Sequence, residues 1–415
     1  MRFGRLIPSA VAAGFVALAT IAAPVQAQET IKILYTDPLS GPFAQVGDQN
    51  LKQFNYMIDT INARGGALGR KFELVPFDNK SQPSDALIAL KRATDQNIPF
   101  IMQCSGSNIA AALIEGVEKH NARNPENRII YVNCGAVAPE LTNEKCSFWH
   151  FRYDNHVGMK AEVMARALPP NITKVYMLNQ DYLFGQAVQR DVKFYLGKIR
   201  PDVQIVGDEL IPLGKIQDFS PYITKIKATG AQALITGNWG PDMTLLIKAG
   251  MDAGIDIGYY TLYAHLGGGA TAIGPGGDGK VRAVMSFSEN HAPEIKNAAA
   301  EAWTKTFREK NNFDFYAAAQ LLLFESIQAG IIKANSLDPT KIALAMEGLK
   351  LKDILGYETT MRKEDHQIVQ TYYVGAFKKG AKYDAEGTGL GWVVEKVIPA
   401  ADLDQPNTCK MKRPS

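Results

Sequence analysis

Residues 31–107 alternate between strand-like and helical runs, and this alternation limits the folds that the chain can adopt. A β-rich run at 31–36 leads through a Gly-Pro loop into a helical run that ends at Gly65-Gly66, and a second β-rich run follows at 71–77. The apolar residues between the two strand-like runs recur at the spacing of one helix face. Strands that alternate with helices in this way form parallel sheets.

The same alternation continues further along the chain, in two series. Strand-like runs follow at 98–103, 129–133, 174–179, 203–206, 233–236 and 259–263, with helical runs around 109–117, 185–199 and 243–253. Residues 297–349 are helical in pattern, and 367–377 read as one more strand. A chain of 415 residues is also too long for one core. We therefore expect an α/β protein with two doubly wound parallel-sheet lobes.

The first 27 residues have the pattern of an export signal. Arg2 and Arg5 precede an apolar stretch at 6–24, and Val25-Gln26-Ala27 forms a small-residue cleavage site. A membrane anchor is the alternative, but the stretch is short for a span of about 20 residues. We predict a signal peptide at 1–27, cleavage after Ala27 and a periplasmic location.

The charge balance excludes some partners. The formal net charge is only +3, and no basic cluster stands out, so we expect no nucleic acid partner. No later segment is long and apolar enough to span a membrane, so the exported chain is not expected to be membrane-spanning. We expect a monomer.

The four cysteines are informative because an exported chain meets an oxidising compartment. Cys104, Cys134, Cys146 and Cys409 allow three pairings, and the sequence alone does not choose among them. Their spacing matches no zinc signature, and we expect neither a metal nor a cofactor.

Enzyme motifs are weak or missing in the sequence. Residues 274–281 approach a phosphate-binding loop, but Val281 stands where that loop needs Ser or Thr for magnesium. The sequence has no Gly-x-Ser-x-Gly elbow and no His-Glu-x-x-His. We therefore expect a binding protein and not an enzyme.

Ligands of doubly wound sheets bind beyond the carboxyl ends of the strands, so the residues that follow each strand are the site candidates. The best anion candidate is Ser105-Gly106-Ser107, which opens a helix whose first N–H groups lack partners. An ordinary helix cap is the alternative for this turn. The other strand-end candidates are Gly135, Ala136, Val137, Asp181, Phe184, Asn238, Trp239 and Tyr263.

The stretch from Ile31 to Leu87, with its Leu-Ser-Gly-Pro loop and its Ala-Arg-Gly-Gly stop, resembles the N-terminal lobe of periplasmic binding proteins for leucine, isoleucine and valine. The resemblance covers nearly the whole exported chain. It implies a type I fold whose lobes are joined by a three-strand hinge, and a carrier that delivers a small molecule to an inner-membrane ABC permease. By analogy, residues 28–152 plus 289–366 form one lobe, and 153–288 plus 367–415 form the other.

The resemblance also assigns roles at the strand ends. In the family, the turn that matches Ser105–Ser107 holds a ligand carboxylate. Val137 stands where a ligand-contacting Thr is usual, Phe184 where a Tyr is usual, and Trp239 where an aromatic ring closes over the ligand.

The acid that pairs with the α-ammonium in amino-acid binders is missing, since no Glu lies between Glu209 and Glu289 and Tyr263 lines up in that region. Two ligand hypotheses therefore stay open. One is an amino acid held through Asp181, and the other is a non-amino carboxylate such as an aromatic acid.

The leucine-binding relatives join the position of Cys104 to a turn in which this chain has Ser81, so Cys104 needs another partner. Cys104 and Cys134 both end strands that should be neighbours, and we predict that they pair. The second predicted pair, Cys146 with Cys409, would staple the C-terminal tail.

A module that reports ligand to a membrane receptor is the alternative to transport, because it would share the same fold and site.

Overall fold

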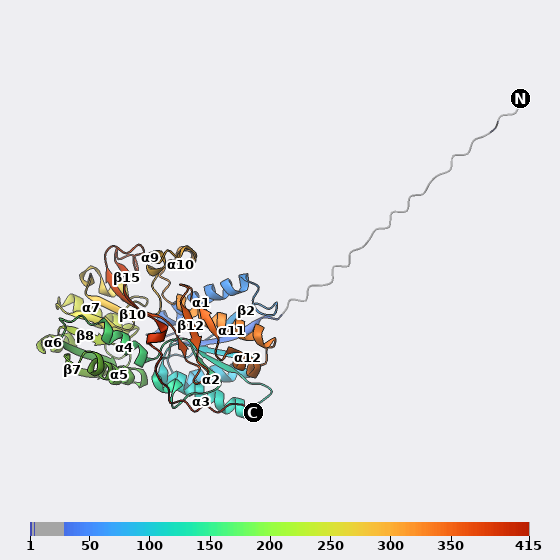
Figure 1. Ribbon diagram of the computed structural model, residues 1–415, viewed down its shortest axis with the longest axis horizontal. Helices are drawn as coiled ribbons and strands as arrows, with labels where there is room; N and C mark the ends of the chain where they lie inside the picture. Colours follow the sequence, from blue (N-terminus) through green and yellow to red (C-terminus); the bar gives the residue numbers. More distant parts are fainter. Residues whose placement is uncertain (2–3, 5–28, 415) are drawn as a thin grey trace.

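The computed structural model describes residues 1, 4 and 29–414, so the predicted cleavage after Ala27 lies outside the described residues. The chain forms two α/β bodies side by side, each built around a twisted sheet (Figure 1). Among the described helices, none is both long and apolar enough to cross a membrane.

The first body is built around a five-stranded sheet of order β2-β1-β3-β4-β5, in which every neighbouring pair is parallel. Its strands are β1 (Ile31–Asp37), β2 (Phe72–Asp78), β3 (Phe100–Gln103), β4 (Ile130–Asn133) and β5 (His150–Arg152). The central strands β3 and β4 are buried along their whole length, as expected for a parallel sheet covered on both faces.

Helices cover both faces of this sheet, with α2 and α3 on one side and α1 and α11 on the other (Figure 1). The helices of this body are α1 (Ala44–Ala63), α2 (Pro83–Asp95), α3 (Ser107–Arg123), α9 (His291–Glu294), α10 (Ala298–Asn311), α11 (Leu321–Ala334) and α12 (Pro339–Met346). Gly65 and Gly66, at φ +99° and +61°, turn the chain after α1, a conformation that glycine adopts without strain.

The second body has a seven-stranded sheet of order β15-β14-β10-β9-β8-β6-β7. Its strands are β6 (Lys174–Gln180), β7 (Gln204–Ile211), β8 (Ala233–Thr236), β9 (Gly258–Thr261), β10 (Val281–Met285), β14 (Tyr372–Lys378) and β15 (Gly391–Ile398). The helices are α4 (Val157–Ala167), α5 (Leu183–Ile199), α6 (Ser220–Ala228), α7 (Pro241–Asp252) and α8 (Gly269–Ile273).

Both sheets have the same strand order over their first five strands, with the second strand in sequence at the edge and the first one beside the third. In such sheets the crevice opens between the first and third strands, where consecutive connections leave in opposite directions. The two crevices, at β1/β3 and at β6/β8, are therefore the places where a ligand is expected.

The connections between the bodies follow β5, β10 and a small antiparallel sheet of β11 (Lys350–Lys352), β12 (Glu358–Met361) and β13 (Ile368–Val369). An isolated bridge between Arg152 and Gln367 ties the first connection to the third. The two-lobed α/β fold is confirmed, while the detailed lobe boundaries stay a prediction.

Three details differ from the expectations. β14 and β15 run antiparallel to their neighbours, so the larger sheet is mixed and not purely parallel. The strand expected at 367–377 is split, because β13 pairs with β12 and β14 belongs to the larger sheet. The C-terminal tail, which we had assigned to the second lobe, returns to the first.

The returning tail is fixed by a disulfide and by hydrogen bonds. Cys409 is bonded to Cys146, with their Cα atoms 5.7 Å apart. The backbone N–H of Thr408 donates to the side chain of Asn143, at 2.8 Å. The second disulfide joins Cys104 to Cys134, whose Cα atoms lie 4.6 Å apart. Both pairs are the predicted ones.

Candidate functional site

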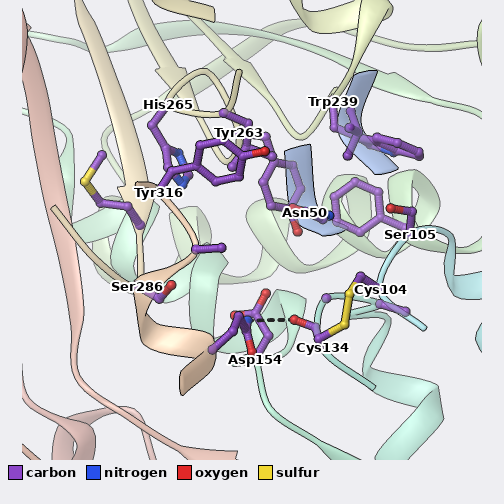
Figure 2. Close-up of a pocket in the computed structure, with 18 of the residues that line it drawn as sticks. Asn50, Cys104, Ser105, Cys134, Asp154, Trp239, Tyr263, His265, Ser286 and Tyr316 are labelled. Carbon is purple, nitrogen blue, oxygen red and sulfur yellow. Dashed lines mark hydrogen bonds between the residues drawn. A yellow bond between two sulfur atoms is a disulfide. The ribbon is translucent and has the colours of Figure 1, made fainter. Parts of the chain in front are cut away.

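A cavity of about 120 Å³ lies between the two bodies, at the carboxyl ends of both sheets. One water needs about 10–15 Å³ by the same kind of volume, so the cavity has room for a small molecule. The disulfide between Cys104 and Cys134 lies on one side with Asp154, and Tyr263 and His265 lie on the opposite side (Figure 2). The lining residues used below are Ser105, Gly106, Ser107, Gly135, Ala136, Asp154, Lys160, Tyr182, Phe184, Trp239, Tyr263, His265, Gln320 and Tyr372.

The Ser105–Ser107 turn lines the cavity, but both donors of Ser105 are already used inside the protein. The backbone N–H and the hydroxyl of Ser105 donate to Asp37, at 2.8 Å and 3.0 Å. The backbone N–H of Cys104 adds a contact of 3.3 Å, and the Tyr35 hydroxyl adds one of 2.9 Å. The internal carboxyl group of Asp37 therefore occupies the donors of Ser105, the first residue of the turn that we had assigned to the ligand.

Asp37 ends β1 and is fully buried. Burial raises the pKa of its carboxyl group, and the hydrogen bonds from Ser105, Tyr35 and Cys104 oppose that rise because they stabilise the ionised form. All four contacts are donors to the carboxyl oxygens, which is the arrangement that a carboxylate requires.

Small residues and an amide form the wall next to this turn. Gly135 and Ala136 follow β4 and line the cavity beside the disulfide. The Gln320 side-chain N–H donates to the carbonyl of Cys134 at 2.7 Å, while its Oε1 has no hydrogen-bond partner. This buried acceptor is available to a donor group on a ligand.

The opposite wall is aromatic and comes from the second body. Trp239 follows β8, and its indole N–H donates to the Tyr182 hydroxyl at 2.8 Å. The rings of Phe184 and Tyr263 lie 5.8 Å apart between centroids. These rings offer flat apolar area to a ligand body, with hydroxyl groups at the rim.

A buried ion pair, Lys160 with Asp154, also lines the cavity. The Lys160 ammonium is 2.7 Å from Asp154 Oδ2, and the two side chains are only 3% and 9% exposed. The Tyr372 hydroxyl donates to the other oxygen of Asp154, and the ammonium reaches the Tyr263 hydroxyl at 3.3 Å. Lys160 also lies over the rings of Tyr263 and Tyr372, at 5.0 Å and 5.5 Å from their centroids.

Burial lowers the pKa of Lys160, and the adjacent Asp154 carboxylate opposes this effect. The pair therefore keeps a charged ammonium in a dry site by neutralising it locally. His265, across the cavity, is different: burial lowers its pKa to about 3, so its ring is neutral at physiological pH.

Three of the predicted site residues do not line the cavity. Asp181 is exposed and accepts a hydrogen bond from Gln186 at 2.9 Å. Val137 packs into the apolar core of the second body, and Asn238 is fully buried with both side-chain polar atoms unpaired. All three follow strand ends, but none of their side chains lines the cavity.

Sequence reasoning also missed central residues, above all Lys160, Asp154, Tyr372 and Gln320. Lys160 could have been noticed, because it stands among apolar residues in the run Val-Gly-Met-Lys-Ala-Glu-Val-Met and is buried on α4. Asp154 lies in the expected hinge, where a lone acid carries no recognisable pattern.

Among residues 29–414, no group of three or more His, Cys, Asp and Glu side chains is placed to hold a metal ion. The chemistry that this site offers is non-covalent: one paired ammonium, unpaired acceptors and aromatic area.

The comparisons with known proteins agree with this architecture. The periplasmic binding protein family matches residues 30–382. The Leu/Ile/Val-binding protein homolog 4 of Brucella melitensis is 31% identical over 412 residues, covering 96% of each chain. The leucine-, isoleucine-, valine-, threonine- and alanine-binding protein of Pseudomonas aeruginosa is 26% identical, over 83% of this chain and 88% of that protein.

A solved structure shows the same similarity in three dimensions. The leucine-, isoleucine-, valine-, threonine- and alanine-binding protein of Brucella ovis, in a closed conformation, superimposes with a TM-score of 0.82 at 30% identity. The superposition covers 93% of this chain and 100% of the Brucella ovis chain. These are families of binding proteins and not of enzymes. The chain belongs to the periplasmic binding proteins with a type I fold, in the branch of the branched-chain amino acid binders.

Proposed function

We propose that this chain is the solute-binding component of an ABC importer. It captures a small ligand with a carboxylate and an apolar body between its two lobes, outside the inner membrane. The loaded form then docks on an inner-membrane permease, after export and removal of residues 1–27. This proposal combines the export signal with the membership in the binding-protein family.

The observation that carries the ligand class is the cavity itself. It places one ammonium, Lys160, beside an aromatic wall that includes Phe184 and Trp239. A carboxylate is the anion that a single buried ammonium suits, and the rings supply the apolar contact area for the rest of the molecule.

The named ligands of the relatives all fit this class. The relatives from Brucella ovis and Pseudomonas aeruginosa are named for leucine, isoleucine, valine, threonine and alanine. Two proteins of Rhodopseudomonas palustris share the fold at 19% and 20% identity and were solved with benzoate and with 4-hydroxybenzoate. At that identity they show that the fold accommodates aromatic acids, and they leave the ligand of this chain open.

Capture needs no covalent chemistry. A ligand that touches both walls makes more contacts when the lobes are together than when they are apart, so it shifts the population toward the closed form. The hinge strands near Arg152 and Gln367 provide the pivot.

The proposal is tested by a thermal-unfolding screen of the exported protein against aliphatic amino acids, aliphatic acids and aromatic acids. A ligand at 100 times its Kd should stabilise the fold by about 2.7 kcal/mol. Uptake of the same compound should be lost when the gene is deleted and should return with the wild-type gene. If no small carboxylate stabilises the protein, the proposed function is wrong.

A further inference from the structure

We propose that the cavity selects monocarboxylates that lack an α-ammonium group, with the ligand carboxylate on Lys160 and not on the Ser105 turn. This inference rests on the proposed function and narrows its substrate class. It follows from where the internal charges of the site already lie.

The first step concerns the Ser105 turn. The backbone N–H and the hydroxyl of Ser105 both donate to Asp37, which is buried directly behind the turn. A ligand carboxylate placed on Ser105 would compete with Asp37 for both donors and would lie close to a second carboxyl group in a buried site. Asp37 therefore disfavours a second anion at this turn, and we place the ligand carboxylate elsewhere.

The second step concerns Lys160. Among the described residues that line the cavity, it is the only lysine or arginine. An ammonium has three donors, and the structure shows two of them in use, on Asp154 at 2.7 Å and on Tyr263 at 3.3 Å. The third donor is left for a ligand oxygen. The ammonium lies over the rings of Tyr263 and Tyr372, and in such a buried place a charge-assisted hydrogen bond is strong.

The third step concerns Asp154, which is the only acidic side chain among the described lining residues. One of its oxygens accepts from Lys160 and the other from Tyr372. An α-ammonium that paired with this acid would take Asp154 from Lys160, which would leave a buried ammonium without its counter-charge. Breaking a buried pair in this way is strongly unfavourable.

The exclusion of amino acids therefore comes from the internal pair and not from cavity size. A carboxylate without the amino group needs only the free donor of Lys160, and its body can lie on the aromatic wall. The unpaired Oε1 of Gln320 is a further acceptor that a hydroxyl group on such a ligand would satisfy.

The test compares ligands of equal shape by titration calorimetry on the purified exported protein. The matched sets are 4-methylpentanoate with L-leucine, and 3-phenylpropionate with L-phenylalanine and 2-phenylethylamine. We expect the affinity of each acid to be at least about 100-fold higher than that of its amino acid, because the amino acid breaks a buried pair. The amine should not bind.

The variant test uses the double substitution Lys160→Met with Asp154→Asn, because Lys160→Met alone leaves a buried charge and endangers folding. The double variant removes both charges and keeps the side-chain volumes. It should lose carboxylate binding while gaining affinity for the neutral 3-phenylpropanamide. Lys198→Met is the matched control, since Lys198 lies over Tyr195 at 5.9 Å on the surface, and it should bind like the wild type.

The outcomes separate this inference from the proposed function. Tighter binding of L-leucine than of 4-methylpentanoate overturns the inference and leaves carboxylate capture standing. Unchanged carboxylate affinity in the double variant also overturns it. If none of the acids and amino acids binds, the proposed function falls and the inference falls with it.

Discussion

The ring of Phe43 lies against the indole of Trp239, with 4.4 Å between the centroids and 38° between the planes. Phe43 precedes α1 in the first body, and Trp239 follows β8 in the second, so this contact joins the two lobes beside the cavity. Two glycines leave room for the ring. A Cβ at Gly240 would lie 2.7 Å from Phe43, and one at Gly214 would lie 2.9 Å from it.

The substitution Phe43→Ala should weaken ligand binding by about 1–2 kcal/mol, because the closed form loses an aromatic pair and its buried area. Small-angle scattering at saturating ligand should show a larger radius of gyration than for the wild type. Phe194→Ala is the control, since that residue is 61% exposed and its ring packs edge-on against Tyr195 of its own helix. Equal affinity in both variants would show that the contact has no role in closure.

Trp239→Ala should weaken binding by roughly 2 kcal/mol or more, as for a central aromatic anchor. Trp239→Phe keeps a ring but loses the hydrogen bond to Tyr182, so calorimetry on both variants separates the apolar contact from the polar one. Wild-type affinity in Trp239→Ala would show that the ligand does not bind against the aromatic wall.

Asp181→Asn should leave ligand affinity unchanged within error, because this carboxylate faces solvent and is bonded to Gln186. The measurement is a calorimetric titration beside the double variant at Lys160 and Asp154. A tenfold loss from Asp181→Asn would restore Asp181 as the acid that holds an amino group.

Much of the fold could be predicted because the alternation of apolar runs is a local property. The strand ends before Ser105, Gly135 and Trp239 were found at the correct places. The use of each donor, in contrast, depends on residues far away in sequence. Ser105 is occupied by Asp37, 68 positions earlier, and no local pattern announces that pairing.

The same reason explains the missed ion pair. Lys160 sits on a helix that would carry a solvated lysine equally well, and only packing against Tyr263 and Tyr372 makes it internal. Asp181 was a reasonable choice from its strand-end position, but its side chain is exposed just before α5, where Gln186 donates to it. Side-chain direction at a strand end is set by the turn, and the pattern does not encode it.

His265 should make stability depend on pH. Its pKa falls to about 3 in the folded protein, whereas an unfolded histidine titrates near 6.5. Between these values the unfolded chain binds a proton that the folded one does not, so the free energy of unfolding falls as the pH drops below about 6.5.

For a ring that stays neutral in the folded protein, the free energy of unfolding is lower by about 2 kcal/mol at pH 5 than it is well above the unfolded pKa. His265→Gln should remove that part of the slope, which urea unfolding at pH 7.5 and at pH 5.0 measures as a difference between variant and wild type. The same slope in both proteins would show that His265 takes up its proton in the folded state.

Cys409→Ser should lower the free energy of unfolding by about 2–4 kcal/mol, because the lost bond closes a long loop in the unfolded chain. Cys146→Ser should have the same effect, and the double variant should be no less stable than either single one. Denaturant unfolding with and without a reductant checks this. An unchanged midpoint in all three variants would mean that the tail adds nothing to the fold.

The bond between Cys146 and Cys409 also sets an order on maturation. These cysteines are 263 positions apart, so Cys146 has no native partner until the chain has been made and exported as far as Cys409. All strands of both sheets precede Cys409 in the chain and have the opportunity to form first. The disulfide that fixes the tail then forms last, after the hinge strands are in place. Its formation marks a chain that was completed through Cys409.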